Sequence, residues 1–188
     1  MANRLGDSTA KLLGRLSLNP MVHIDWIGTV LFPFLMFVIP QFMFFGWAKP
    51  VPINPRYIKG RYGTLWVALA GPASNLLLAV LFALLFRVVI PYVNPLALSE
   101  ETLRTLKIVF EMIETGVFLN LTLAFFNLIP IPPLDGSQIL ASLLPYRYQY
   151  IVDALRQYGS MVLLLLLWTG GLRIVHIPVL WMAQFLLP

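Results

Sequence analysis

The chain has 188 residues, of which 59% are hydrophobic and 11% are charged, and its mean hydropathy is +0.82. This composition excludes an ordinary soluble domain and indicates a multi-pass membrane protein whose surroundings are a lipid bilayer. The formal net charge of +5 does not indicate a nucleic-acid partner, because the Lys and Arg residues lie mostly in short loops beside apolar runs, where they orient a membrane protein.

The first 26 residues are polar and mixed. Leucines alternate loosely with small and polar residues as far as Asn19-Pro20, a pattern that predicts a short strand or two at the membrane surface. His23 and Asp25 follow, and their side chains would share one face of an extended segment. Two interpretations of this pair stay open: an interfacial turn that contains a hydrogen-bonded His, or side chains that line a site.

The first apolar run covers residues 27–45, about the length that a helix needs to cross the hydrocarbon of a bilayer. Pro33 and Pro40 should bend it, as membrane helices tolerate where neighbouring groups satisfy the freed carbonyls. The loop 46–63 contains several basic residues and no acidic one, which predicts a cytoplasmic position. Its basic residues are Lys49, Arg56, Lys59 and Arg61.

The clearest membrane-spanning helix is predicted over residues 64–89. One polar motif, Gly71-Pro72-Ala73-Ser74-Asn75, interrupts it. Small residues recur at four-residue spacing in and after this motif, and such residues let a second helix approach closely. Helix packing therefore explains the motif from its spacing alone. The small residues are Ala70, Ser74, Ala79 and Ala83.

A second long helix is predicted to run through residue 115, from within residues 91–115 to residue 129. Its first part, within residues 91–115, carries a charged stripe at helical spacing, which predicts a solvated, non-cytoplasmic face. Its second part, residues 116–129, is apolar and returns through the membrane. The stripe consists of Glu100, Arg104, Lys107, Glu111 and Glu114.

The last apolar run lies within residues 159–171, after a second basic loop that contains Arg147 and Arg156. The segment 177–188, with His176 just before it, is predicted to be interfacial. We therefore expect an all-α multi-pass membrane protein with about four membrane segments. At least one of them should be broken by proline, and a short surface strand region should precede them.

The segment after the second long helix places polar residues at the end of an apolar run. These residues are Asn127 and Asp135, and an ionisable group at that depth is costly unless it has a partner or a task. Three prolines between them end the helix and keep the segment extended. Gly136 then permits close approach of the backbone. The spacing of Asp135-Gly-Ser-Gln138 also fits a helix cap, which would need no further function.

A family resemblance rests on these residues. The segment Asn127-Leu-Ile-Pro-Ile-Pro-Pro-Leu-Asp135-Gly136 resembles the Asn-x-x-Pro-x-Pro-x-x-Asp-Gly motif of the site-2 protease family, zinc metalloproteases that cut peptide bonds inside the membrane. Other segments, in the same order, resemble the compact bacterial branch of that family. They are Gly6-Asp7-x-Thr9-Ala10, Gly14-Arg15-Leu16-x-Leu18-Asn19-Pro20, His23-Ile24-Asp25, Gly46-Trp47-Ala48-Lys49-Pro50-Val51-Pro52-x-Asn54-Pro55 and Gly71-Pro72-x-x-Asn75.

The resemblance implies a single membrane-embedded peptidase-like domain over residues 1–188, with one zinc ion and Asp135 as the third zinc ligand. It also implies that Asn75 faces the active-site cavity, where an amide could hold a substrate backbone or a polarised carbonyl. Asn127 would orient nearby groups, since metal ligands need supporting hydrogen bonds. The substrate would be a transmembrane protein, and the location the inner membrane of a bacterium.

The chain departs from the family in one respect. The other two zinc ligands and the catalytic Glu of the family lie in a His-Glu-x-x-His helix just before the segment that begins here at Leu5-Gly6-Asp7. His23 and His176 are the only histidines, and the chain has no cysteine, so the zinc site of the family cannot be assembled from this chain. We expect either a start that is truncated or an inactive relative, and no activity from this chain alone.

Two other functions remain as alternatives. One is a non-catalytic membrane module that keeps the fold and binds membrane helices without cutting them. The other is a small transporter or proton relay that uses Asp135.

Overall fold

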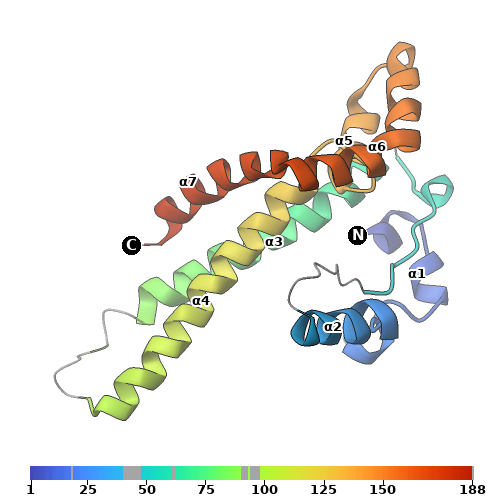
Figure 1. Cartoon of the computed structure of the whole chain (residues 1–188). Helices are drawn as coiled ribbons and strands as arrows, with labels where there is room; N and C mark the ends of the chain where they lie inside the picture. Colours follow the sequence, from blue (N-terminus) through green and yellow to red (C-terminus); the bar gives the residue numbers. More distant parts are fainter. Residues whose placement is uncertain (18, 40–47, 61, 90–92, 94–97, 188) are drawn as a thin grey trace. The chain divides into compact units, whose positions relative to one another are not determined.

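The computed structural model describes all residues except 18, 40–47, 61, 90–92, 94–97 and 188 (Figure 1). The described residues form helices and loops and contain no strand. Their contacts divide the chain into two compact units, unit 1 with residues 1–63 and unit 2 with residues 64–188, and each is described by itself. The prediction of an all-α multi-pass membrane protein is confirmed, whereas the predicted surface strand is wrong.

Short helices and turns make up unit 1. Side-chain oxygens bond to the backbone two residues on, as Asn19 Oδ1 does when it accepts from Met21 N at 3.0 Å, and such bonds favour helical turns over an extended strand. The loose alternation of leucines therefore misled the strand prediction for residues 1–26. The elements are η1 (Ala2–Leu5), α1 (Thr9–Leu12), η2 (Pro20–Val22), η3 (Trp26–Leu31), α2 (Phe32–Val38) and η4 (Pro55–Tyr57).

The buried carboxylate of Asp7 joins two distant segments of unit 1. One oxygen accepts from the amide and hydroxyl of Thr9, and the other accepts from the amide of Asn54 at 2.8 Å. Beside it, Lys59 N donates to Leu5 O at 2.7 Å. The bond from the Thr9 hydroxyl, followed by the bonds from the two amides, lowers the pKa of Asp7 below its ordinary value of 3.8.

The lowered pKa of Asp7 predicts how the stability of the protein responds to acid. A depressed pKa stabilises the folded state above pH 3.8, and this contribution is lost as the pH falls through the lower pKa of the folded protein. Asp7→Asn removes the charge but keeps the size of the side chain. We expect its Tm in detergent to fall below that of the wild type near about pH 6, and the gap to shrink toward about pH 2.

A matched control for this test is Asp153→Asn. The Asp153 carboxylate is exposed, and its only ion pair among the described residues is with Arg156 at 3.8 Å. Its Tm should therefore differ little from that of the wild type at any pH. A gap for Asp7→Asn that stays constant or widens in acid would contradict the role given to the Asp7 carboxylate.

The first apolar run forms a helix over its described part. Residues 26–38 are helical, with π geometry in η3 and α geometry in α2, and the end of the predicted segment 27–45 lies outside the described residues. Asp25 Oδ1 caps the start by accepting from the amides of Ile27 and Gly28, at 3.1 and 2.9 Å. Pro33 is in the first turn of α2, where its missing N–H is tolerated.

Unit 2 contains the long helices. Three helical stretches among the described residues are long and apolar enough to cross a membrane: residues 63–89, 100–127 and 150–169. The elements are α3 (Gly63–Val89), α4 (Glu100–Asn127), α5 (Asp135–Leu143), η7 (Tyr146–Tyr148), α6 (Gln149–Thr169), η8 (Gly171–Val175) and α7 (His176–Leu186). In Figure 1, α3 and α4 run antiparallel along each other and α7 lies against them.

Sequence signals account for the course of α4. Ser99 caps it by accepting from Thr102 N at 3.3 Å, and the acidic residues Glu100 and Glu101 occupy the first turn, where the helix dipole favours negative charge. In the predicted charged stripe, Lys107 and Glu111 form an ion pair of 3.9 Å with both side chains exposed. The stripe and the apolar part thus belong to one continuous helix, as expected.

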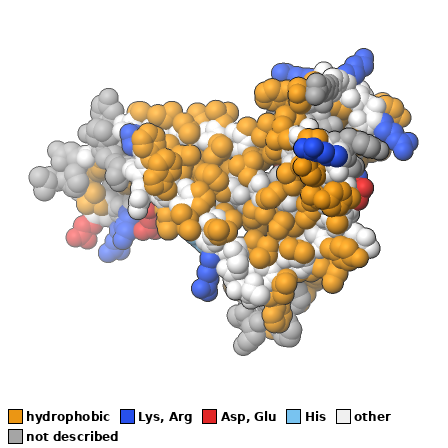
Figure 2. Space-filling model, turned by 90° about the horizontal axis from the view of Figure 1, so that it is seen from above, with side chains coloured by type: hydrophobic (Ala, Val, Ile, Leu, Met, Phe, Trp, Pro, Cys, Tyr) orange, Lys and Arg blue, Asp and Glu red, His pale blue; other side chains and the backbone are white. Residues whose placement is uncertain are grey.

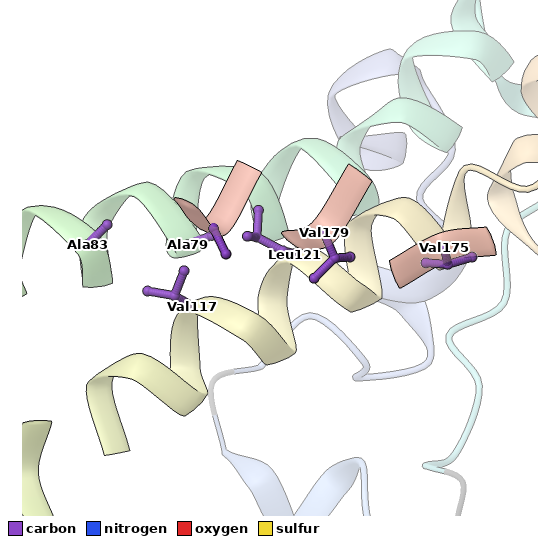
Figure 3. Packing of buried hydrophobic residues seen from close by; sticks show 7 residues of the cluster. Ala79, Ala83, Val117, Leu121, Val175 and Val179 are labelled. Atoms are coloured by element: carbon purple, nitrogen blue, oxygen red, sulfur yellow. The ribbon is translucent and has the colours of Figure 1, made fainter. Parts of the chain in front are cut away.

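The helices of unit 2 pack through small and β-branched residues. The core contains Ala79 and Ala83 of α3, Val117 and Leu121 of α4, and residues from η8 and α7 (Figure 3). The remaining core residues are Val175, Val179 and Ala183. Ala79 and Ala83 let the other helices approach α3 closely, so the predicted packing role of these two alanines is confirmed. At the end of α3, the Arg87 guanidinium donates to the carbonyls of the last turn of α7, at 2.9 and 3.0 Å.

Most large apolar side chains of these helices point outward. In α3 only 17% of the most apolar window is buried within the protein, and Trp168 of α6 is 89% exposed. Figure 2 shows hydrophobic side chains over most of the visible face. An apolar surface of this extent is expected where lipid, rather than water, is the solvent.

Candidate active site

Asp135 is the first residue of α5, directly after the proline-rich loop. α4 ends at Asn127, and the loop 128–134 turns through backbone bonds such as Leu134 N to Ile131 O at 3.0 Å. The Pro132–Pro133 peptide in this loop is cis. The loop therefore carries the chain from the end of a spanning helix directly to the carboxylate.

Gly136 locks the start of α5 against the end of α4. A Cβ added to Gly136 would lie 2.3 Å from the carbonyl oxygen of Leu128 and 2.4 Å from that of Ile129. No side chain fits there, so the close approach expected at Gly136 is to the protein's own backbone. Gly159 of α6 packs in a similar way, because a Cβ there would lie 2.7 Å from Pro132 Cδ. Both glycines hold the loop before Asp135 in place.

The carboxylate of Asp135 lies against the backbone of α3. A Cβ added to Gly71 would be 2.7 Å from Asp135 Oδ2, so only glycine leaves room for the carboxylate in its present position. We call this half-buried place between the start of α5 and Gly71 the carboxylate niche. The sequence motif Gly71-Pro72 did not predict this contact. Its only sequence signal is a glycine inside an otherwise apolar helix.

Within the described part of the chain, the Asp135 carboxylate has no hydrogen-bond or ion-pair partner. The N-cap position of α5 belongs to Leu134, and no side chain caps this helix. The interpretation of Asp135 as a simple cap therefore finds no support in the geometry. Burial raises the pKa of the Asp135 carboxyl above its ordinary value of 3.8, because desolvation disfavours the charged form.

Asn75 lies on the same side of α3 as the niche. It is four residues after Gly71, one helical turn away, and helical side chains lean toward the N-terminal end of their helix. Helix geometry therefore places Asn75 next to Gly71 along one face of α3. Asn127, by contrast, donates its side-chain amide to Leu123 O of its own helix at 2.9 Å.

The two histidines and Asp25 have local roles in the structure. His23 Nε2 lies 3.0 Å from Ser17 O, and Asp25 caps η3, which agrees with the interpretation of a turn that contains a hydrogen-bonded His. His176 is exposed at the start of α7 and lines an open hollow together with Arg173.

One carboxylate is only part of a zinc site. A catalytic zinc needs three protein ligands, and the described residues contain no group of three or more His, Cys, Asp or Glu side chains that could hold a metal ion. The described residues therefore do not fit a complete zinc site. No hydrolytic step can be assigned to these residues alone.

Comparisons with known proteins agree with the motifs. The family model described as "Peptidase family M50" matches residues 54–169. The chain is 38% identical over 167 residues to "Putative zinc metalloprotease YwhC" of Bacillus subtilis (strain 168), covering 88% of this chain and 70% of that protein. It is 30% identical over 174 residues to "Putative zinc metalloprotease Rip2" of Mycolicibacterium smegmatis (strain ATCC 700084 / mc(2)155), covering 90% of this chain and 60% of that protein.

No solved structure matches this chain. The family match covers more than half of the chain and includes both sides of the carboxylate niche, Gly71 and Asp135. The chain therefore belongs to peptidase family M50, the site-2 protease family.

Proposed function

We propose that this protein is the carboxylate-bearing part of an intramembrane zinc metalloendopeptidase in the inner membrane of a bacterium. It would hydrolyse peptide bonds in the transmembrane segments of other proteins, and Asp135 would be a zinc ligand. The observation that carries this proposal is the carboxylate niche, in which Asp135 is half-buried against Gly71 without a hydrogen-bond partner among the described residues.

A bound metal ion would stabilise the charged carboxylate of Asp135 in the niche. A partly buried carboxylate with no partner is destabilised by desolvation, and a bound cation compensates this cost. The chain has no cysteine, so an Asp oxygen is among the few ligand types that it offers. In the family the other ligands and the general base lie in a His-Glu-x-x-His helix, a motif that residues 1–188 do not contain.

The position of the niche supports a membrane-embedded substrate. Asp135 lies eight residues after the end of α4, and Asn75 lies within α3, both helices being long enough to span a bilayer. The two residues would therefore meet a substrate beside the spanning helices. There the Asn75 amide would hold the substrate backbone. The close approach of Gly71 would keep the carboxylate oxygen of Asp135 in position to bind zinc.

A cleavage assay tests this proposal. A version of the protein with a His-Glu-x-x-His helix ahead of Leu5 is reconstituted into vesicles with a model transmembrane substrate, and its products are identified by mass spectrometry. We expect cleavage within the transmembrane segment, and its loss in Asp135→Asn and with a zinc chelator. The exposed Asp153→Asn serves as the control and should cut normally.

Two results would decide against the proposal. Cleavage that is unaffected by Asp135→Asn would remove Asp135 from the site. Binding of the transmembrane substrate without any product would favour the non-catalytic module instead. An in-frame His-Glu-x-x-His in the genomic DNA upstream would favour the peptidase before any protein is made.

A further inference from the structure

The net positive charge of the chain comes entirely from unit 1. Residues 1–63 contain seven Lys or Arg and two Asp, a formal charge of +5, whereas residues 64–188 contain six Lys or Arg and six Asp or Glu. The net charge of the whole chain, +5, thus comes from its first third. Such a segregation concentrates a positive potential on one unit.

The two acidic residues of unit 1 form no ion pair with its described cations. Asp7 is 1% exposed and gives both of its oxygens to Thr9 and Asn54. Asp25 accepts from the amides that begin η3. Neither forms an ion pair with any cation that the structure describes. Arg15 donates to the carbonyl of Val22, whereas the other described basic side chains of unit 1 remain available to a negatively charged partner.

The fold brings three of these cations onto adjacent segments. Leu5 O accepts from Lys59 N at 2.7 Å, and Asp7 accepts from Asn54 N at 2.8 Å, so residues 4–7 lie beside residues 54–59. A Cβ on Gly6 would lie 3.2 Å from Lys59 Cγ, which shows that the Lys59 stem crosses Gly6. We define the basic cluster as Arg4, Arg56 and Lys59, all of which are exposed.

The cluster is tied to the level of the lipid headgroups by chain connectivity. Lys59 lies four residues before Gly63, the first residue of the spanning helix α3, and four residues reach at most about 14 Å. Tyr57 lies between Arg56 and Lys59 in the sequence, and its side chain is 59% exposed. Tyrosine is enriched at membrane–water interfaces. A basic and aromatic surface so close in the chain to the start of α3 has the composition that suits the level of phospholipid phosphates.

We propose that the basic cluster binds the phosphate groups of anionic phospholipids in the membrane that the helices of unit 2 span. The charge complementarity selects anionic over zwitterionic headgroups, and each cation near an anionic surface strengthens the attraction. Lipid is favoured over an acidic segment of a protein because the cluster is so close to a spanning helix. This role is independent of zinc and of Asp135, so it can hold whether or not the protein cleaves a substrate.

The test counts bound lipids. The whole chain is purified in dodecyl maltoside micelles that contain phosphatidylglycerol or phosphatidylcholine at equal mole fraction, and the retained lipids are counted by native mass spectrometry. The variant Arg4→Gln/Arg56→Gln/Lys59→Gln removes the charges of the cluster but keeps the bonds that Leu5 O and the Asp7 carboxylate accept from backbone amides. The matched control, Arg104→Gln/Lys107→Gln/Arg156→Gln, removes three exposed cations from unit 2.

We expect the wild type and the control to retain phosphatidylglycerol in preference to phosphatidylcholine. The cluster variant should lose this preference by about fivefold for each cation removed, with an unchanged Tm in phosphatidylcholine micelles. The preference should also weaken as salt is raised, because the cluster is exposed. Addition of glycerol phosphate at the same ionic strength should not displace the lipid, since an isolated phosphate lacks the membrane anchor.

Three results would overturn the assignment. The first is equal retention of both lipids by the wild type. The second is an equal loss of preference in the control, which would make the effect one of total charge. The third is tight binding of a poly-glutamate probe by the cluster together with no preference among lipids, which would identify an acidic polypeptide as the partner.

Discussion

Asp135→Ala should remove bound zinc from a version of the protein that carries a His-Glu-x-x-His helix ahead of Leu5. The carboxylate is held in the niche by Gly71 and Gly136, so alanine leaves a gap that no neighbouring ligand among the described residues can fill. Loss of a direct ligand should exceed the 10- to 100-fold or so that is typical for loss of a supporting hydrogen bond. Elemental analysis should show zinc falling from about one per chain to near zero.

The same experiment separates a ligand from a helix cap. If Asp135 only stabilised α5, the alanine variant would keep its zinc and lose about 1 kcal/mol of unfolding free energy. A second control is the chain expressed from Met1 alone, which should hold no stoichiometric zinc. Tightly bound zinc in that chain would mean that His23 or His176 serves as a ligand, and the assignment of the site would be wrong.

Gly71→Ala should impair the site while leaving the fold largely intact. The added Cβ would lie 2.7 Å from Asp135 Oδ2, so the carboxylate must move. Alanine is a better helix former than glycine by about 1 kcal/mol, which offsets part of the steric cost in α3. A displacement of about 1 Å can cost about 100-fold in rate. We therefore expect a large loss of cleavage with a small change in Tm.

The control for Gly71→Ala is Ala73→Val, which adds bulk at an exposed position two residues further along the same helix. This variant should cleave the model transmembrane substrate at the wild-type rate. Full activity in Gly71→Ala would show that cleavage does not depend on the position of the Asp135 carboxylate against α3. The proposal that the niche positions a zinc ligand would then be wrong. A large fall in Tm would instead place the role of Gly71 in packing.

Local sequence signals predict the spanning helices α3 and α4 well. Long apolar runs define α3 and α4, Ser99 and the acidic first turn begin α4, and the prolines end it. These features act within a few residues along the chain, and they can therefore be read from the sequence. The same is true of Ala79 and Ala83, whose small size at helical spacing predicts packing.

The contact between Gly71 and Asp135 could not be predicted in the same way. It joins residues 64 positions apart, and its geometry depends on how α3, α4 and the loop pack together. The strand prediction for residues 1–26 was wrong for another reason. Side-chain hydrogen bonds, such as the one that Asn19 Oδ1 accepts from Met21 N, favour turns more strongly than the weak alternation of leucines favours a strand. The amide of Asn127, expected to orient groups at the site, bonds to its own helix at Leu123 O in this structure.

The most direct test of a metal in the carboxylate niche is anomalous X-ray diffraction at the zinc edge from crystals of a version that carries the His-Glu-x-x-His helix. The account predicts one strong anomalous peak at about 2.0–2.2 Å from a carboxylate oxygen of Asp135, beside Gly71. A zinc peak bound elsewhere, with the Asp135 carboxylate bonded only to backbone amides, would contradict it.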